Sequence, residues 1–144
     1  MNYAEIKYND IANGVGVRTS LFVSGCSHHC KGCFNEIAWD YKYGYTYNDE
    51  VQEKILYSLH NPFISGLSIL GGEPLCDRNL YNVSKLIKAC RKRYNDKKDI
   101  WVYSGYTLEE LEEKYNNDNN PFLRTCYNII KNNIDILVDG RFVE

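Results

Sequence analysis

The sequence is short of the features that mark secreted, membrane-spanning and nucleic-acid-binding proteins. No apolar run in its 144 residues approaches the roughly 20 residues that a membrane-spanning helix needs. The first residues lack the basic start and apolar core of a signal peptide. The formal net charge is −2, so there is no excess of positive charge to attract nucleic acid or an anionic membrane. We therefore expect a cytoplasmic protein that binds neither nucleic acid nor membrane.

Internal repeats, low-complexity segments and linkers are also missing, and the length suits one domain, which we expect to span residues 1–144. A domain of this size buries enough surface to fold without disulfide bonds or a structural metal. The six cysteines therefore need another explanation. In the reducing cytosol, cysteines are more often metal ligands or catalysts than disulfide partners.

Hydrophobic periodicity predicts short strands that alternate with helices. The predicted strands are short apolar runs, each followed closely by glycine, and cover residues 19–23, 66–70, 100–103 and 134–138. The predicted helices cover residues 48–60, 78–94, 107–115 and 122–132. Thr107 and Glu110 form a capping box at the start of the third helix. This order predicts an α/β fold with right-handed crossovers and a parallel sheet.

Three of the cysteines form a C-x3-C-x2-C pattern in a loop directly after the first predicted strand: Cys26, Cys30 and Cys33. Parallel α/β folds place their chemistry at such strand ends. Three thiolates around a 4Fe-4S cluster would leave one iron open for a small molecule, whereas a fourth ligand would close the site. The pattern therefore makes this loop the leading candidate for a metal centre.

The spacing alone leaves alternatives open. A structural zinc site could be completed by His28 or His29, although solvated loop positions suit these histidines better. Cys76 could act as a fourth cluster ligand. Cys90 and Cys126 fall on apolar helix faces and are predicted to be small core residues.

A second group of small residues follows the second predicted strand, in the run Leu70-Gly71-Gly72-Glu73-Pro74. Such a strand end exposes backbone groups and one carboxylate without bulky side chains, and it suits an ammonium group. By itself the pattern is more often only a turn. Beside an open-iron loop on the neighbouring strand, it becomes a candidate site for an amino-acid-like ligand.

With these two elements the sequence resembles the radical S-adenosylmethionine (SAM) superfamily, whose cysteine loop corresponds to Cys26, Cys30 and Cys33 and whose Gly-Gly-Glu motif corresponds to Gly71, Gly72 and Glu73. Within it, the chain is similar to the activating enzymes of glycyl-radical proteins. Their longer pattern appears here as Gly14, Gly16, Arg18, Phe22, Gly25 and Asn35 around the cysteines. A match at fixed spacing over this stretch is far more specific than a lone cysteine triplet.

The resemblance implies a partial (β/α) barrel of the radical SAM type, with a mostly parallel sheet and helices on the outside. It implies a radical SAM oxidoreductase with two cofactors, a 4Fe-4S cluster that has three cysteine ligands and one open iron, and SAM. Reductive cleavage of SAM at the cluster would give a 5'-deoxyadenosyl radical, which would generate a glycyl radical on the partner. The implied partners are the large subunit of an anaerobic ribonucleoside-triphosphate reductase and a low-potential electron donor.

Site residues are carried over by position. The implied metal ligands are Cys26, Cys30 and Cys33. The residues implied to contact SAM lie in the same loop and at two strand ends: Gly32, Cys33, Phe34, Gly71, Gly72, Glu73 and Ser104. No catalytic side chain is expected beyond these cluster and SAM ligands. Arg18 would either support the cluster loop or only anchor its strand.

Two rival functions remain open. One is a radical SAM enzyme that acts on a small molecule, against which the short chain argues because it leaves little polypeptide to enclose a free substrate. The other is a zinc-binding interaction module that uses the three loop cysteines and His29. The basic residues Arg91, Lys92 and Arg93 are expected at the end of a helix because of its macrodipole, which is a simpler explanation than an acidic partner.

Overall fold

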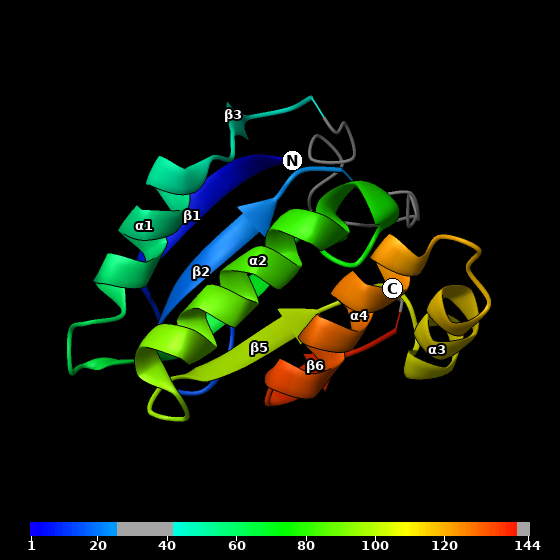
Figure 1. Ribbon diagram of the computed structural model, residues 1–144. Coiled ribbons are helices and arrows are strands. Elements are labelled where there is room, and N and C mark those ends of the chain that lie inside the picture. Colours follow the sequence, from blue (N-terminus) through cyan, green and yellow to red (C-terminus); the bar gives the residue numbers. More distant parts are fainter. Residues whose placement is uncertain (26–41, 141–144) are drawn as a thin grey trace.

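A computed structural model describes residues 1–25 and 42–140, which form one six-stranded sheet and four helices (Figure 1). The sheet order is β3-β1-β2-β4-β5-β6. The strands are β1 Asn2–Asp10, β2 Val17–Val23, β3 Tyr45–Thr46, β4 Ile64–Gly71, β5 Asp99–Tyr103 and β6 Ile136–Val138. The helices are α1 Asp49–Ser58, α2 Asp77–Tyr94, α3 Leu108–Asn116 and α4 Pro121–Asn133.

The alternating part of the predicted fold is confirmed, but the sheet is mixed rather than mostly parallel. The four predicted strands are β2, β4, β5 and β6, and they pair in parallel in that order. The error lies at the start of the chain, where β1 pairs antiparallel with both β2 and β3. Register shifts interrupt β1 on both sides of its centre, so its side chains do not keep the two-residue alternation by which a strand is recognised.

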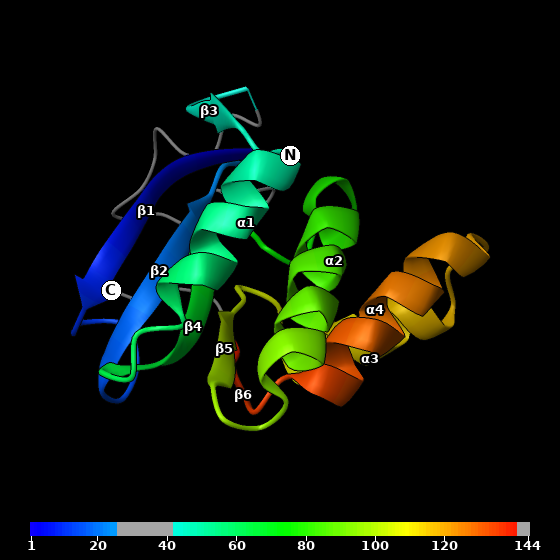
Figure 2. The same cartoon turned by 60° about the vertical axis from the view of Figure 1, so that its left-hand side comes forward.

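The core lies between one face of the sheet and the helices. Leu21, Leu67, Ile69, Ile100 and Val102 are fully buried, and the strand register places them on that same face. Helices α1, α2 and α4 cover this face (Figure 2). Burying aliphatic side chains between the two layers is the main force that holds a two-layer domain together.

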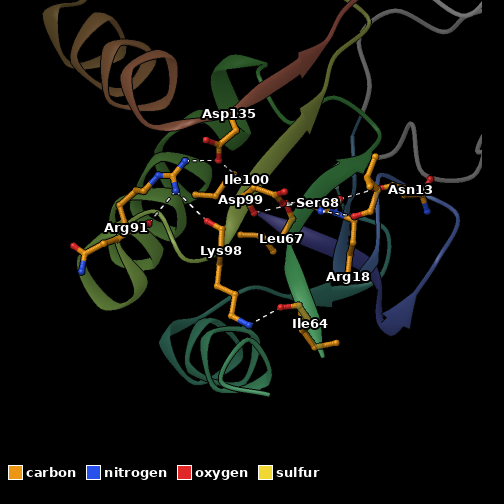
Figure 3. A network of polar contacts seen from close by, with 12 residues as sticks. Asn13, Arg18, Ile64, Leu67, Ser68, Arg91, Lys98, Asp99, Ile100 and Asp135 are labelled. Atoms are coloured by element: carbon orange, nitrogen blue, oxygen red, sulfur yellow. Dashed lines mark hydrogen bonds and ion pairs between the residues drawn. The ribbon is translucent and has the colours of Figure 1, made fainter. Parts of the chain in front are cut away.

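Arg18 is the second residue of β2, near the end of the strand that lies away from the cysteine loop. Figure 3 shows its contacts. Its side chain is fully buried. Nε donates to Ser68 Oγ at 2.7 Å, and Nη2 donates to the Leu67 carbonyl at 3.0 Å. Nη2 also pairs with Asp99 Oδ1 at 2.6 Å. One side chain thereby connects β2, β4 and β5, so Arg18 acts as a strand anchor.

Two glycines of the same sequence pattern lie close against neighbouring side chains, Gly14 against Arg18 and Gly16 against Ser65. A Cβ on Gly14 would lie 2.7 Å from Arg18 Cδ, and one on Gly16 would lie 2.2 Å from Ser65 Oγ. Both have positive φ angles, +130° for Gly14 and +81° for Gly16, a region that side chains disfavour. The Gly-x-Gly-x-Arg part of the pattern therefore has a structural explanation in this chain.

Two arginines in the last turn of α2, and Lys98 shortly after it, bond to groups of the same chain. Arg91 Nη2 pairs with Asp135 Oδ2 at 2.5 Å (Figure 3), and Arg93 binds both carboxylate oxygens of Glu53. Lys98 Nζ donates to the carbonyl oxygen of Ile64 at 2.5 Å. These contacts are more specific than the macrodipole interaction that the sequence suggested.

None of the helices in residues 1–25 and 42–140 is long and apolar enough to span a membrane.

Candidate functional site

The candidate site lies where the parallel strands end. Gly71 ends β4, Gly72 and Glu73 follow it, and Ser104 follows β5. The neighbouring end of β2 leads through Ser24 and Gly25 into the cysteine loop. The predicted loop residues Cys26, Gly32, Cys33 and Phe34, with Cys30, His28 and His29, lie outside the described residues.

The end of β2 and the Gly-Gly-Glu turn are in direct contact. The N–H of Gly72 donates to the Val23 carbonyl at 2.8 Å, and the N–H of Glu73 donates to the Gly25 carbonyl at 2.6 Å. A Cβ on Gly72 would lie 2.2 Å from the Gly25 oxygen. Gly71 has a φ of +110°, which disfavours any side chain. Both glycines are therefore required by the close approach of two backbones, whatever ligand the site takes.

The two ends of the cysteine-containing segment are tied together at the same place. Ser24 Oγ donates to the Tyr43 carbonyl at 2.6 Å, and the side-chain amide of Asn2 donates to the Lys42 carbonyl at 3.0 Å. The N–H of Ser24 donates to the Asn2 carbonyl at 3.0 Å. Residues 24 and 43 thus lie side by side, so the loop that carries the three cysteines starts and finishes at the end of β2.

Glu73 joins the ends of two strands through its carboxylate. The residue is fully buried. Oε2 accepts hydrogen bonds from the Ser104 hydroxyl at 2.9 Å and from the N–H of Leu75 at 3.0 Å. Oε1 accepts one from the N–H of Gly105 at 2.7 Å. A carboxylate can accept several hydrogen bonds at once, and bonds of this charged kind are the stronger ones. The structure therefore brings Glu73 and Ser104 together, as two residues of one contact.

Two buried residues that support this turn were missed by the sequence reasoning. Asn79, in the first turn of α2, donates from its amide to the carbonyls of Ser24 and Glu73, both at 3.0 Å. Tyr115 of α3 donates to the Leu75 carbonyl, and burial raises the pKa of its hydroxyl far above the usual range. The only available signal was that each is a polar residue on an apolar helix face, which also fits many purely structural positions.

The cysteines outside the loop are buried. Cys76, Cys90 and Cys126 have exposures of 3% or less. Burial raises the pKa of Cys90 to about 11, which keeps it protonated and unreactive. The prediction that Cys90 and Cys126 are core residues is confirmed. Within the described part of the chain, no group of three or more histidine, cysteine or acidic residues could hold a metal ion.

Comparison with known proteins places this arrangement in a class. Residues 12–144 match the family model of the 4Fe-4S single cluster domain, so the loop, the strand ends and the helices described above all fall within one iron–sulfur domain family.

Relatives define the family more narrowly. The chain is 38% identical to the anaerobic ribonucleoside-triphosphate reductase-activating protein of Vibrio cholerae, over 100% of this chain and 86% of that protein. Its identity to the protein of the same name from Escherichia coli K12 is 36% over the same shares. The phage T4 protein of that name is 31% identical over 99% of this chain and 81% of its own length. The chain belongs to the family of anaerobic ribonucleoside-triphosphate reductase-activating proteins.

Proposed function

We propose that this chain activates an anaerobic ribonucleoside-triphosphate reductase by generating a glycyl radical on its large subunit. The observation that carries the proposal is the similarity over the whole chain to proteins named as activators of that reductase. The match to a 4Fe-4S domain over residues 12–144 supports the cofactor. The small-molecule rival has no comparable support, because the relatives are named for their action on a protein.

The ligands of the proposed cluster are Cys26, Cys30 and Cys33. This donor set fits a 4Fe-4S cluster with one open iron, because thiolates are the usual ligands of such clusters. Cys90 and Cys126 belong to the hydrophobic core, whereas Cys76, at the start of α2, stays the alternative fourth ligand. The fixed contact between Ser24 and Tyr43 supports a loop held at one place.

SAM is proposed to bind between this loop and the strand ends. The contacts would come from Gly32, Cys33 and Phe34 on the loop side, and from the strand ends at Gly71, Gly72, Glu73 and Ser104. Once bound, the cofactors would supply the radical chemistry: one electron from the reduced cluster would cleave SAM reductively, and a hydrogen atom would be removed from a glycine Cα of the partner. A low-potential electron donor would reduce the cluster.

The part of this chain is to bind and position. The glycines leave backbone carbonyls free of side-chain obstruction, and a carbonyl can accept hydrogen bonds from an ammonium group. The Glu73 carboxylate holds the turn after β5 against the turn after β4. We propose that the whole chain forms one radical SAM domain, in which the mixed sheet is part of a partial barrel with its helices outside, and that it works in the cytoplasm without binding nucleic acid.

Anaerobic reconstitution tests the cluster. We expect a brown protein with about four iron and four sulfide per chain. Cys26→Ala should lose most of the iron, because two thiolates hold the cluster poorly, whereas Cys90→Ala should keep it. A colourless protein that binds one zinc would overturn the proposal.

The activity is tested with the reduced, reconstituted protein, SAM and the large reductase subunit. Electron paramagnetic resonance should detect a glycyl radical doublet on the reductase. That signal should be absent with Cys26→Ala and present with Cys90→Ala. Cleavage of SAM without the doublet would favour an enzyme that acts on a small molecule.

A further inference from the structure

Asn79 connects the two segments that the proposed function assigns to the cluster and to SAM. It lies in the first turn of α2 and its exposure is 1%. Its Nδ2 donates to the carbonyl of Ser24 and to the carbonyl of Glu73, each at 3.0 Å. Ser24 stands two residues before Cys26, and Glu73 is the last residue of the Gly-Gly-Glu motif. One buried amide group therefore bridges the start of the cysteine loop and the turn beside it.

The chemistry of the two neighbours fixes which atom of Asn79 faces them. Both are backbone carbonyl oxygens, which only accept hydrogen bonds, so the atom between them must be the amide nitrogen with its two hydrogens. Each hydrogen serves one carbonyl. No other uncharged side chain of this size offers two hydrogens on one atom. An aspartate at this position would instead turn an oxygen toward two oxygens.

At the start of α2, the side chain of Asn79 bonds to groups outside its own helix. The N-cap residue Cys76 makes no side-chain cap hydrogen bond, although the first turn of a helix commonly receives one. Asn79 stands at the third helical position, where a polar side chain often bonds back to the N-cap. Its amide is directed to Ser24 and Glu73 instead. This use of a helix-start residue points to a role outside the helix.

We propose that Asn79 is a positioning residue that fixes the start of the cysteine loop relative to the Gly-Gly-Glu turn, and thereby sets the affinity for SAM. The inference rests on the proposed function, in which SAM binds between these two segments. Loss of the bridge leaves every proposed ligand in place and leaves the two backbone hydrogen bonds of Gly72 and Glu73 to the end of β2, but it removes the side-chain link that fixes the start of the loop more tightly against the turn. SAM affinity should therefore fall while cluster loading is retained.

The test uses the reconstituted full chain and SAM itself as the probe. We expect Asn79→Ala to weaken SAM binding about tenfold, as the loss of two buried hydrogen bonds implies, with iron content unchanged. In steady-state cleavage, the KM for SAM should rise more than kcat falls. Hydrogen exchange of residues 71–75 should accelerate in the variant even without the cluster, which provides a readout independent of activity.

The isosteric variant Asn79→Asp provides a second test that does not change side-chain volume. When the new side chain is ionised, Asn79→Asp should weaken SAM binding at least as much as Asn79→Ala does. Burial raises the pKa of a carboxyl group, and the protonated form can donate one hydrogen bond. The ratio of variant to wild-type dissociation constants should therefore decrease between about pH 8 and about pH 6. Asn82→Asp, on the same helix, is the matched control and should bind SAM as the wild type does.

The outcomes separate the two proposals. If the wild-type protein loads iron but neither binds nor cleaves SAM, the proposed function fails, and hydrogen exchange still reports on the bridge. If the wild type binds SAM and both Asn79 variants bind it equally well, the positioning role is wrong. Failure of both variants to fold would also overturn it, because Asn79 would then be only a structural residue.

Discussion

Glu73 and Ser104 follow the ends of the adjacent strands β4 and β5, and their side chains are hydrogen-bonded to each other. The Gly-Gly-Glu run marked Glu73 as a candidate site residue, and the family resemblance implied that Ser104 also contacts SAM. The sequence could not predict that the Ser104 hydroxyl would face the Glu73 carboxylate at 2.9 Å. That contact depends on the register between β4 and β5, in which Ile69 lies beside Val102, and on the path of two turns that have no periodicity.

Removing the Ser104 hydroxyl should destabilise the fold measurably. Ser104→Ala leaves a buried carboxylate with one donor fewer, at a cost of about 1.5–3 kcal/mol in the free energy of unfolding. Ser84→Ala is the matched control: its buried hydroxyl donates to the Tyr81 carbonyl, a neutral acceptor, and should cost about 1 kcal/mol. Urea unfolding of the cluster-free chain measures both values. Equal losses would mean that the Glu73 contact has no special strength.

Among the elements, α3 has the start that the sequence specified most completely. The Thr107 hydroxyl oxygen accepts from the N–H of Glu110 at 3.1 Å, and the Glu110 carboxylate accepts from the N–H of Thr107 at 3.0 Å. The predicted capping box is confirmed. It matters beyond the helix, because α3 carries Tyr115, whose hydroxyl supports the turn after Glu73.

Thr107→Ala should therefore lower stability and loosen the start of α3. We expect a loss of about 1 kcal/mol, as for other N-cap threonines. Thr125→Ala is the control, since its hydroxyl donates to the Pro121 carbonyl on an exposed part of α4 and caps no helix. Thermal unfolding compares the two variants, and amide exchange at Glu110 should accelerate only in the first. An unchanged melting temperature for Thr107→Ala would contradict the assigned role.

The two strands that sequence reasoning missed have a common physical explanation. A strand is recognised by side chains that alternate between a buried and an exposed face. In β1 the register shifts break this alternation, and Lys7, Tyr8 and Asn9 are consecutive exposed residues. The strand β3 has only two residues, both exposed. Its existence depends on pairing with the distant Asn2 and Tyr3, and no local pattern encodes that contact.

At the scale of the whole molecule, the six cysteines comprise three in the loop sequence and three in the described part of the chain. The loop sequence places three of them together after β2, whereas Cys76, Cys90 and Cys126 are buried apart from solvent. Apolar helix faces made the core positions of Cys90 and Cys126 predictable. The burial of Cys76 was harder to predict. Cys76 is the N-cap of α2, shortly after the Gly-Gly-Glu turn, and burial there depends on how three strand ends converge.

This division predicts two rates of alkylation in the cluster-free, folded chain. At about pH 8, iodoacetamide should label Cys26, Cys30 and Cys33 and leave the other three thiols unmodified, because only accessible thiolates react. For Cys90 a pKa of about 11 adds a chemical barrier to the steric one. Raising the pH toward this value should not by itself expose the buried thiols, whereas unfolding in urea should make all six reactive.

Mass spectrometry of peptides measures the alkylation of each cysteine separately. The reconstituted protein is the control, in which the cluster protects the loop thiols as well. Labelling of Cys90 or Cys126 as fast as Cys26 in the folded chain would show that the helix layer does not shield them.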